Sequence, residues 1–135
     1  MKYKNIELEL PPIGEIIVTK NEYDNYFFGY YYLSFEKRKF CSIYSLPLPG
    51  TITFLDSDYS AETKWAKMPK FKLLKTERPP IGVEVLLSWL TIAGRGYSQA
   101  TNLKGYILED RVKESYKKAT VDSWIRIETF QEGGE

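Results

Sequence analysis

The chain contains no histidine and a single cysteine among its 135 residues. Without histidine it cannot form a Ser-His-Asp or Cys-His catalytic set, or a zinc site with histidine ligands. One cysteine is too few for a disulfide framework. Cys41 lies in a segment with strand-like alternation, so we expect a buried, unreactive thiol. These absences predict a protein without catalytic residues, a bound metal or a cofactor.

Long apolar runs and a surplus of either charge are also missing. The longest apolar run, residues 83–90, is interrupted by Glu84 and is far shorter than the ~20 residues of a membrane-spanning helix. The charged residues near Met1 do not fit an export signal. The 19 basic and 18 acidic residues give a net charge of +1, so long-range attraction for nucleic acid or a membrane is weak. We expect a cytoplasmic protein that does not act at a membrane.

The densest carboxylates of the chain are Asp56 and Asp58, which are followed by Glu62. Oxygen ligands of this kind suit a hard cation such as calcium or magnesium. The segment lacks the glycine and the full ligand series of an EF-hand loop, and a solvated loop is the preferred interpretation.

Aromatic residues, in contrast, are abundant, with 11 Tyr, 7 Phe and 3 Trp. The aromatic segment 26–35 is typical of a strand. Further strands are expected at residues 16–20, 40–46, 51–55, 83–90 and 124–130, with a turn at residues 36–39, a flexible connection at 93–96 and a short helix within 109–120.

An internal similarity organises the chain. The sequence Glu-Leu-Pro-Pro-Ile-Gly, which starts at Glu9, recurs as Glu-Arg-Pro-Pro-Ile-Gly from Glu77, and each copy is followed by a tryptophan, Trp65 or Trp124. Two consecutive prolines fix the backbone and remove two amide donors, so the motif belongs at the entry to a strand. Matched motifs at both ends indicate two homologous units.

The predicted fold class is therefore mostly β, with one short helix. We expect two tandem units, residues 1–70 and 71–135, each a small β-barrel or curled sheet, joined near residues 70–76. Units this small bury little surface alone, so we expect them to pack as a pseudo-twofold pair in one compact body. The first copy is nine residues longer between its Pro-Pro pair and its tryptophan, an excess expected within residues 35–57.

The short motifs carry a family resemblance. The segment 10–18, the Gly-Tyr strand at 29–31, and Trp65 with Met68-Pro69 resemble the DUF551 family of small phage and prophage proteins of unknown function. Residues 78–86 and Trp124 resemble a second, degenerate copy. The resemblance implies a small β-rich accessory protein of a bacteriophage or mobile element, and it supplies no catalytic residues.

The tyrosine run supplies the candidate binding surface. Successive strand side chains point to opposite faces, so Tyr31 must lie opposite Tyr30 and Tyr32. Aromatic residues beside basic ones are favoured in protein interfaces. The partner-binding residues that the sequence predicts are Tyr30, Tyr32, Lys37, Arg38 and Arg95.

Two functions and one structural alternative use the same residues. The preferred function is binding to a bacterial protein, as an inhibitor of a host or defence protein. The alternative function is binding of single-stranded nucleic acid, in which tyrosines stack on bases and the basic residues follow the backbone; the balanced charge counts against it. The structural alternative buries both faces of the tyrosine strand, one in the core and the other between the units.

Overall fold

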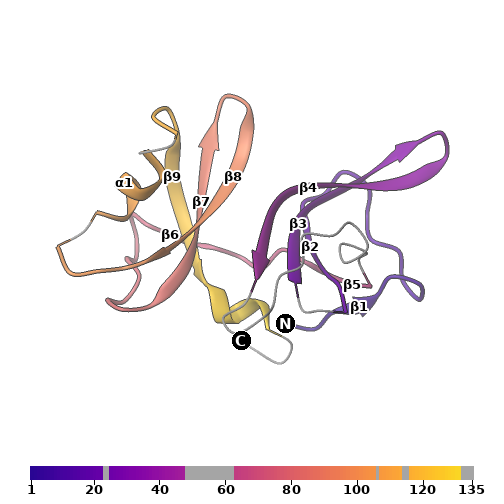
Figure 1. The fold of residues 1–135 in the computed structure, drawn as a ribbon, viewed down its shortest axis with the longest axis horizontal. Coiled ribbons are helices and arrows are strands. Elements are labelled where there is room, and N and C mark those ends of the chain that lie inside the picture. The colour runs from indigo at the N-terminus through magenta and orange to yellow at the C-terminus, as the bar shows by residue number, and fades with distance from the viewer. Residues whose placement is uncertain (23–24, 48–62, 106, 114–115, 132–135) are drawn as a thin grey trace. The chain divides into compact units, whose positions relative to one another are not determined.

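The computed structural model describes residues 1–22, 25–47, 63–105, 107–113 and 116–131. These residues form mostly β-strands, with one short α-helix and one 3-10 helix among them, which confirms the mostly β prediction. They divide into two units, each with its own sheet (Figure 1): Met1–Pro69 and the chain from Phe130 onward form unit 1, and Lys70–Thr129 forms unit 2. In the described part of the chain, no helix combines the length and apolar character needed to cross a membrane.

Unit 1 is an antiparallel sheet with the strand order β1-β5-β2-β3-β4. The strands are β1 (Lys4–Asn5), β2 (Ile17–Lys20), β3 (Asn25–Ser34), β4 (Lys37–Pro47) and β5 (Lys64–Lys67). On one face, Ile17, Tyr31 and Trp65 form a buried cluster. On the other face, the ring of Phe28 packs edge-on against Phe130, with centroids 5.0 Å apart. Both faces of the central strands are thus covered.

Unit 2 is an antiparallel sheet with the order β6-β9-β7-β8. Its strands are β6 (Lys72–Leu73), β7 (Glu84–Thr91), β8 (Gly94–Thr101) and β9 (Thr120–Arg126). Helix α1 (Leu108–Lys113) buries Leu108 and Val112 against one face of the sheet, in a cluster that includes Leu87 and Trp124. In the described residues both sheets are open and not closed into barrels, so the curled-sheet form of the predicted architecture is the one observed.

The repeated sequence motif occupies matching hydrogen-bonded positions in the two sheets. The indole Nε1 of Trp65 donates to the carbonyl oxygen of Glu9 at 2.8 Å, and Nε1 of Trp124 donates to that of Glu77 at 2.7 Å. Each glutamate is also paired with a lysine that lies over the same indole ring. Lys4 Nζ is 5.0 Å from the Trp65 ring and Lys72 Nζ is 5.3 Å from the Trp124 ring, and their salt bridges to Glu9 and Glu77 span 2.6 and 3.1 Å. We call each set of three residues a tryptophan clasp.

The two Pro-Pro-Ile-Gly corners also match. Gly14 and Gly82 have positive φ values of 80° and 84°, a conformation that glycine adopts without strain. The amide of Gly14 donates to the carbonyl of Tyr31 at 2.9 Å, and that of Gly82 to the carbonyl of Asn102 at 2.7 Å. The corners lead into β2 and β7. Gly14 thus bonds to β3, the neighbour of β2, and Gly82 bonds to the residue that directly follows β8, the neighbour of β7.

Strand β8 was not expected, because residues 93–96 were predicted to be a flexible connection. Gly94–Thr101 instead pairs with β7 along its length, with Trp89 opposite Gly96. A Cβ atom at position 96 would lie 2.3 Å from the Trp89 ring. The indole thus occupies the space that a side chain at position 96 would need. Packing within the sheet, and not a loop, explains the glycine at this position.

Three other predicted boundaries were wrong. The expected linker at 70–76 contains β6, whose Lys72 pairs with Trp124. The expected helix is shorter, α1 only, and Thr120 already belongs to β9. The expected strand 124–130 ends at Arg126 and continues as a 3-10 helix, Ile127–Phe130. Three residues per turn bring Ile127 and Phe130 to the same side, and both are buried. The expected strand at 51–55 and the pair Asp56 and Asp58 lie outside the described residues.

Candidate protein-binding surface

The tyrosine run lies in a two-stranded ribbon at the end of the unit 1 sheet. β2 pairs with β3 only as far as Gly29, whereas β4 continues beside β3 to Ser34. We call residues 30–41, the hairpin beyond this point, the β3–β4 ribbon (Figure 1). At its base, a Cβ on Gly29 would lie 2.0 Å from the carbonyl oxygen of Cys41. The strands approach closely there, beside a β-bulge between Phe28 and Gly29.

The pairing register gives the ribbon two different faces. Side chains directly opposite each other in an antiparallel pair share a face. Tyr30, Tyr32 and Ser34 are opposite Cys41, Lys39 and Lys37, respectively, and these six residues form what we call the Tyr30 face. The other face carries Tyr31 and Leu33, opposite Phe40 and Arg38.

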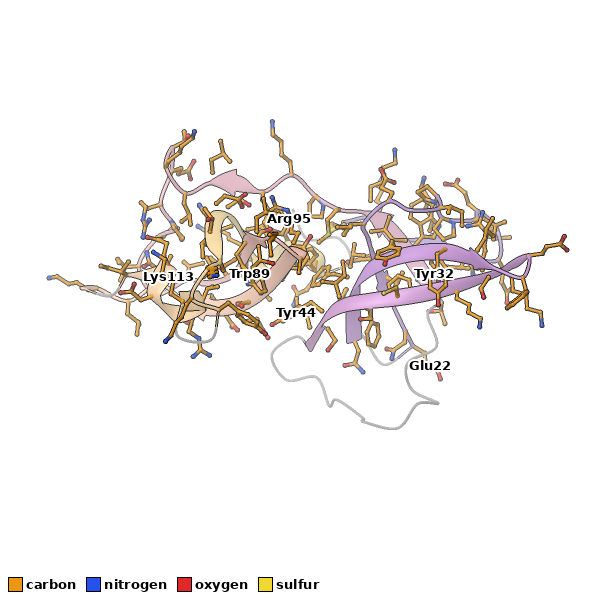
Figure 2. All side chains as sticks on the ribbon, turned by 90° about the horizontal axis from the view of Figure 1, so that it is seen from above. Glu22, Tyr32, Tyr44, Trp89, Arg95 and Lys113 are labelled. Carbon is orange, nitrogen blue, oxygen red and sulfur yellow. The ribbon has the colours of Figure 1, made fainter. Side chains whose placement is uncertain are left out.

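One of these faces is fixed to the core and the other is open. Tyr31 is only 8% exposed and packs against Phe40, with ring centroids 5.0 Å apart. On the Tyr30 face, Tyr32 is 40% exposed, and both lysines opposite are exposed. The rings of Tyr30 and Tyr32 lie 6.4 Å apart at 58°; Figure 2 labels Tyr32 on the ribbon. The face therefore presents two adjacent phenols bordered by two ammonium groups.

Tyr30 is held as a neutral phenol. A hydrogen bond with the Cys41 side chain raises the pKa of Tyr30 above its ordinary value. Cys41 is half-buried, not fully buried as expected from the sequence. Tyr30 thus offers a hydroxyl group for hydrogen bonding and a ring surface at neutral pH.

Arg38 lies on the opposite face of the ribbon from Tyr30, Tyr32 and Lys37. Its guanidinium donates to the carbonyl oxygen of Pro11, so it joins the ribbon to the Pro-Pro corner. A single isolated bridge between Ile13 and Tyr31 ties the same corner to β3. Arg38 therefore braces the ribbon, and the basic residue opposite Tyr32 is Lys39.

Arg95, which is labelled in Figure 2, belongs to β8 in unit 2 and is engaged in a polar network. Its two terminal nitrogens donate to the two carboxylate oxygens of Asp122, each at 3.0 Å, and one also donates to Ser88 Oγ at 2.6 Å. Ser123 Oγ donates to Asp122 at 2.9 Å. The hydrogen bonds that Arg95 donates to Asp122 raise the pKa of Arg95. Partial burial alone would raise the pKa of Asp122, but the hydrogen bonds from Arg95 and Ser123 lower it below its usual value.

Sequence reasoning missed the most exposed aromatic residue of the ribbon. Phe35 is 98% exposed at the tip, where it forms a two-residue turn with Glu36. Both residues have positive φ, 51° and 64°, the pattern of a type I′ turn, which strongly favours Asn-Gly. A side chain in this region costs roughly 1–3 kcal/mol. The predicted turn at 36–39 was wrong because no glycine or asparagine marks the true turn, and Lys37 already starts β4.

Charge on the ribbon is mostly of one sign. Lys37, Arg38 and Lys39 follow one another on β4, and Glu36 is the one acidic residue of the segment. In the part of the chain that the structure describes, no group of three or more His, Cys, Asp or Glu residues is arranged to hold a metal ion. Comparison with known protein families, curated proteins and solved structures finds no match. The resemblance to DUF551 stays an expectation.

Proposed function

We propose that the chain is a non-enzymatic accessory protein of a phage or mobile element that binds a bacterial protein through the Tyr30 face of the β3–β4 ribbon. Inhibition of a host or defence protein is the expected consequence. The observation that carries this proposal is the adjacent pair of half-buried Tyr30 and exposed Tyr32, bordered by Lys37 and Lys39, on a ribbon whose opposite face is anchored to the core through Tyr31.

Physical chemistry favours such a surface as an interface. Tyrosine combines a large apolar ring with few rotatable bonds and a hydroxyl group, so it loses little entropy when it is buried by a partner. Bracing by Arg38 and by the Ile13 bridge lowers the cost of ordering the ribbon on binding. Lysines at the rim contribute mainly to the association rate and to the choice of partner.

The matched clasps and corners support a further part of the proposal, that the two units are repeats of one ancestral unit. In the matched register, Asn102 takes the place of Tyr31 as acceptor for the corner glycine. Strand β8 ends at Thr101, one residue earlier, whereas β3 continues into the ribbon. The ribbon is thus an addition to the shared pattern, and this asymmetry favours unit 1 as the binding unit.

Affinity capture with matched variants tests the proposal. We expect full-length wild-type protein, incubated with lysate of the bacterium that carries the gene, to retain a specific protein after nuclease treatment. The double variants Tyr30→Ala/Tyr32→Ala and Lys37→Glu/Lys39→Glu should each reduce that capture at least tenfold, because interface aromatics and complementary charges are lost. Lys117→Glu/Lys118→Glu is the control, since it makes the same charge change at exposed residues of unit 2.

Two results would overturn the proposal. One is unchanged capture by both ribbon variants. The other is capture that disappears with nuclease and reappears as salt-sensitive binding to a single-stranded oligonucleotide, which would support the nucleic-acid alternative. Circular dichroism of each variant establishes that its sheets are intact before capture is compared.

A further inference from the structure

The tip of the ribbon has a conformation that its sequence does not favour. Neither Phe35 nor Glu36 is a residue type that readily adopts positive φ, yet both do so, at 51° and 64°. Asparagine and glycine would fit this turn without strain. A strained backbone that persists at an exposed position is a reason to look for a function that depends on the residue placed there.

What the turn places there is an apolar side chain in solvent. Phe35 is 98% exposed at the apex, Leu33 is 62% exposed on one face below it, and Tyr32 is 40% exposed on the other. Exposed apolar surface on the apex and on both sides of a two-stranded ribbon suits insertion into a concave site, since a flat partner would cover only one side. Contiguous exposed apolar surface is typical of interaction sites.

The ribbon is also held in position for insertion. Arg38 and the isolated Ile13 bridge join it to the Pro-Pro corner, where the Gly14 amide bonds the Tyr31 carbonyl at 2.9 Å. At the base, Gly29 allows the close approach of the Cys41 carbonyl. A braced hairpin with a predetermined turn loses little conformational entropy when it enters a pocket.

The charges around the tip indicate what kind of pocket it fits. Lys37 and Lys39 are exposed just after the apex and are complementary to acidic groups at the rim of a site. Glu36 lies beside Phe35 at the apex itself, where it would repel the phosphates of a nucleic acid or of an anionic membrane. A protein pocket meets both requirements, because it can combine an apolar floor with carboxylates placed at its rim.

We infer that Phe35 is the anchor residue of the interface and inserts into an apolar pocket with an acidic rim on a protein partner. This inference rests on the proposed function and deepens it from an open face to a specific mode of binding. Buried aromatic anchors near the centre of an interface dominate its affinity, so the tip contributes more to binding than the Tyr30 face beside it.

One variant separates binding from folding. Phe35→Asn with Glu36→Gly places the preferred type I′ pair in the turn. Its thermal midpoint should be equal to or higher than that of the wild type, because strain is removed, while capture of the partner should fall at least tenfold. A purely structural role for Phe35 predicts the opposite, a lower midpoint. The matched control is Ile92→Asn, at the fully exposed tip of the β7–β8 hairpin, which should leave capture unchanged.

Photo-crosslinking locates the anchor directly. Full-length protein with p-benzoylphenylalanine at position 35 should cross-link to one protein in the lysate, at a peptide that lines an apolar pocket bordered by Asp or Glu. The same probe at position 92 should give little of this product. Equal products from the two positions, or cross-links to nucleic acid or lipid, would overturn the inference.

The variants also separate this inference from the proposed function. If Phe35→Asn/Glu36→Gly keeps full capture while Tyr30→Ala/Tyr32→Ala loses it, the anchor role of Phe35 is refuted and binding through the Tyr30 face is supported. If both variants keep full capture, or if the wild type captures no protein, both are refuted.

Discussion

The stability of unit 2 depends in part on the ionised state of one side chain, the carboxylate of Asp122. Its carboxylate accepts both terminal nitrogens of Arg95 and the hydroxyl of Ser123. Bidentate pairs of this kind are stronger than ordinary surface ion pairs, although the two side chains are still 32% and 38% exposed and solvent screens part of the interaction. We assign the network a structural role in unit 2. Contact between Arg95 and a partner stays a prediction from the sequence.

Asp122→Asn should lower the free energy of unfolding by about 1 kcal/mol at pH 7, because the amide keeps the shape but loses the charge and one acceptor. The sign of the pH dependence follows from the lowered pKa of Asp122. Its contribution is complete above the unfolded-state pKa of about 3.9 and is lost as the pH falls through the lower pKa of the folded state. Urea unfolding of the wild type and of Asp122→Asn should therefore show a difference in unfolding free energy at pH 7. This difference should disappear as the pH falls through the lowered pKa of Asp122.

Glu128→Gln provides the comparison for this prediction. Its pair with Arg126 spans 3.7 Å and its side chain is 66% exposed, so removal of the charge should have little effect at either pH. If the difference in unfolding free energy between the wild type and Asp122→Asn persists unchanged in strong acid, the network does not stabilise the ionised carboxylate.

Among the elements, the β3–β4 ribbon depends most on one small residue. Gly29→Ala would place a Cβ 2.0 Å from the Cys41 carbonyl oxygen, a contact with backbone that no side-chain rotation can relieve. The strands must separate at the bulge, and we expect a loss of roughly 2–3 kcal/mol in unfolding free energy. Chemical denaturation measures it, and Ser34→Ala on the same strand serves as the control. A Gly29→Ala protein as stable as the wild type would mean that the ribbon base is loosely packed.

The same ribbon shows which parts of the fold and site the sequence could predict. Alternation correctly separated Tyr31 from Tyr30 and Tyr32, because the side-chain period of a strand does not depend on where the strand ends. Arg38 was selected together with Tyr30 and Tyr32, but it lies on the other face of the ribbon. Sequence could not show this, because the face of a β4 residue depends on the turn, and the turn at Phe35 and Glu36 carries no glycine or asparagine. Phe35 was missed for the same reason.

Elements whose residues serve tertiary packing were the least predictable. β8 contains Gly-Arg-Gly-Tyr-Ser-Gln, a composition typical of a loop. It becomes a strand because Gly96 accommodates the Trp89 ring and because Arg95 finds Asp122 on β9. Asp122 lies 27 residues from Arg95, and the contact of Gly96 with Trp89 depends on the register of the β7–β8 hairpin, so composition alone could not reveal either partner. Arg95 was selected as a binding residue in the absence of that partner.

For the whole molecule, the two clasps allow a comparison between units. The predicted division into a first and a second half is close to the observed one, except that the chain from Phe130 onward returns to unit 1. Within each unit, the clasp joins the first short strand, the segment beside the Pro-Pro corner and the strand that carries the tryptophan. If the units are repeats, equivalent changes in the two clasps should have equivalent consequences.

Trp65→Phe and Trp124→Phe provide that comparison, because phenylalanine keeps a ring but removes the indole N–H that bonds Glu9 or Glu77. Trp65 and Trp124 are 2% and 1% exposed, so each change removes a part-buried hydrogen bond and leaves a small cavity. Each should cost about 2–4 kcal/mol of unfolding free energy, measured by urea denaturation. Hydrogen exchange should show increased exposure confined to β1 and β5 for the first variant and to β6 and β9 for the second. Similar losses with local exchange would support two equivalent units, whereas a large loss for one variant and none for the other would show that the matching hydrogen bonds do not carry matching energies.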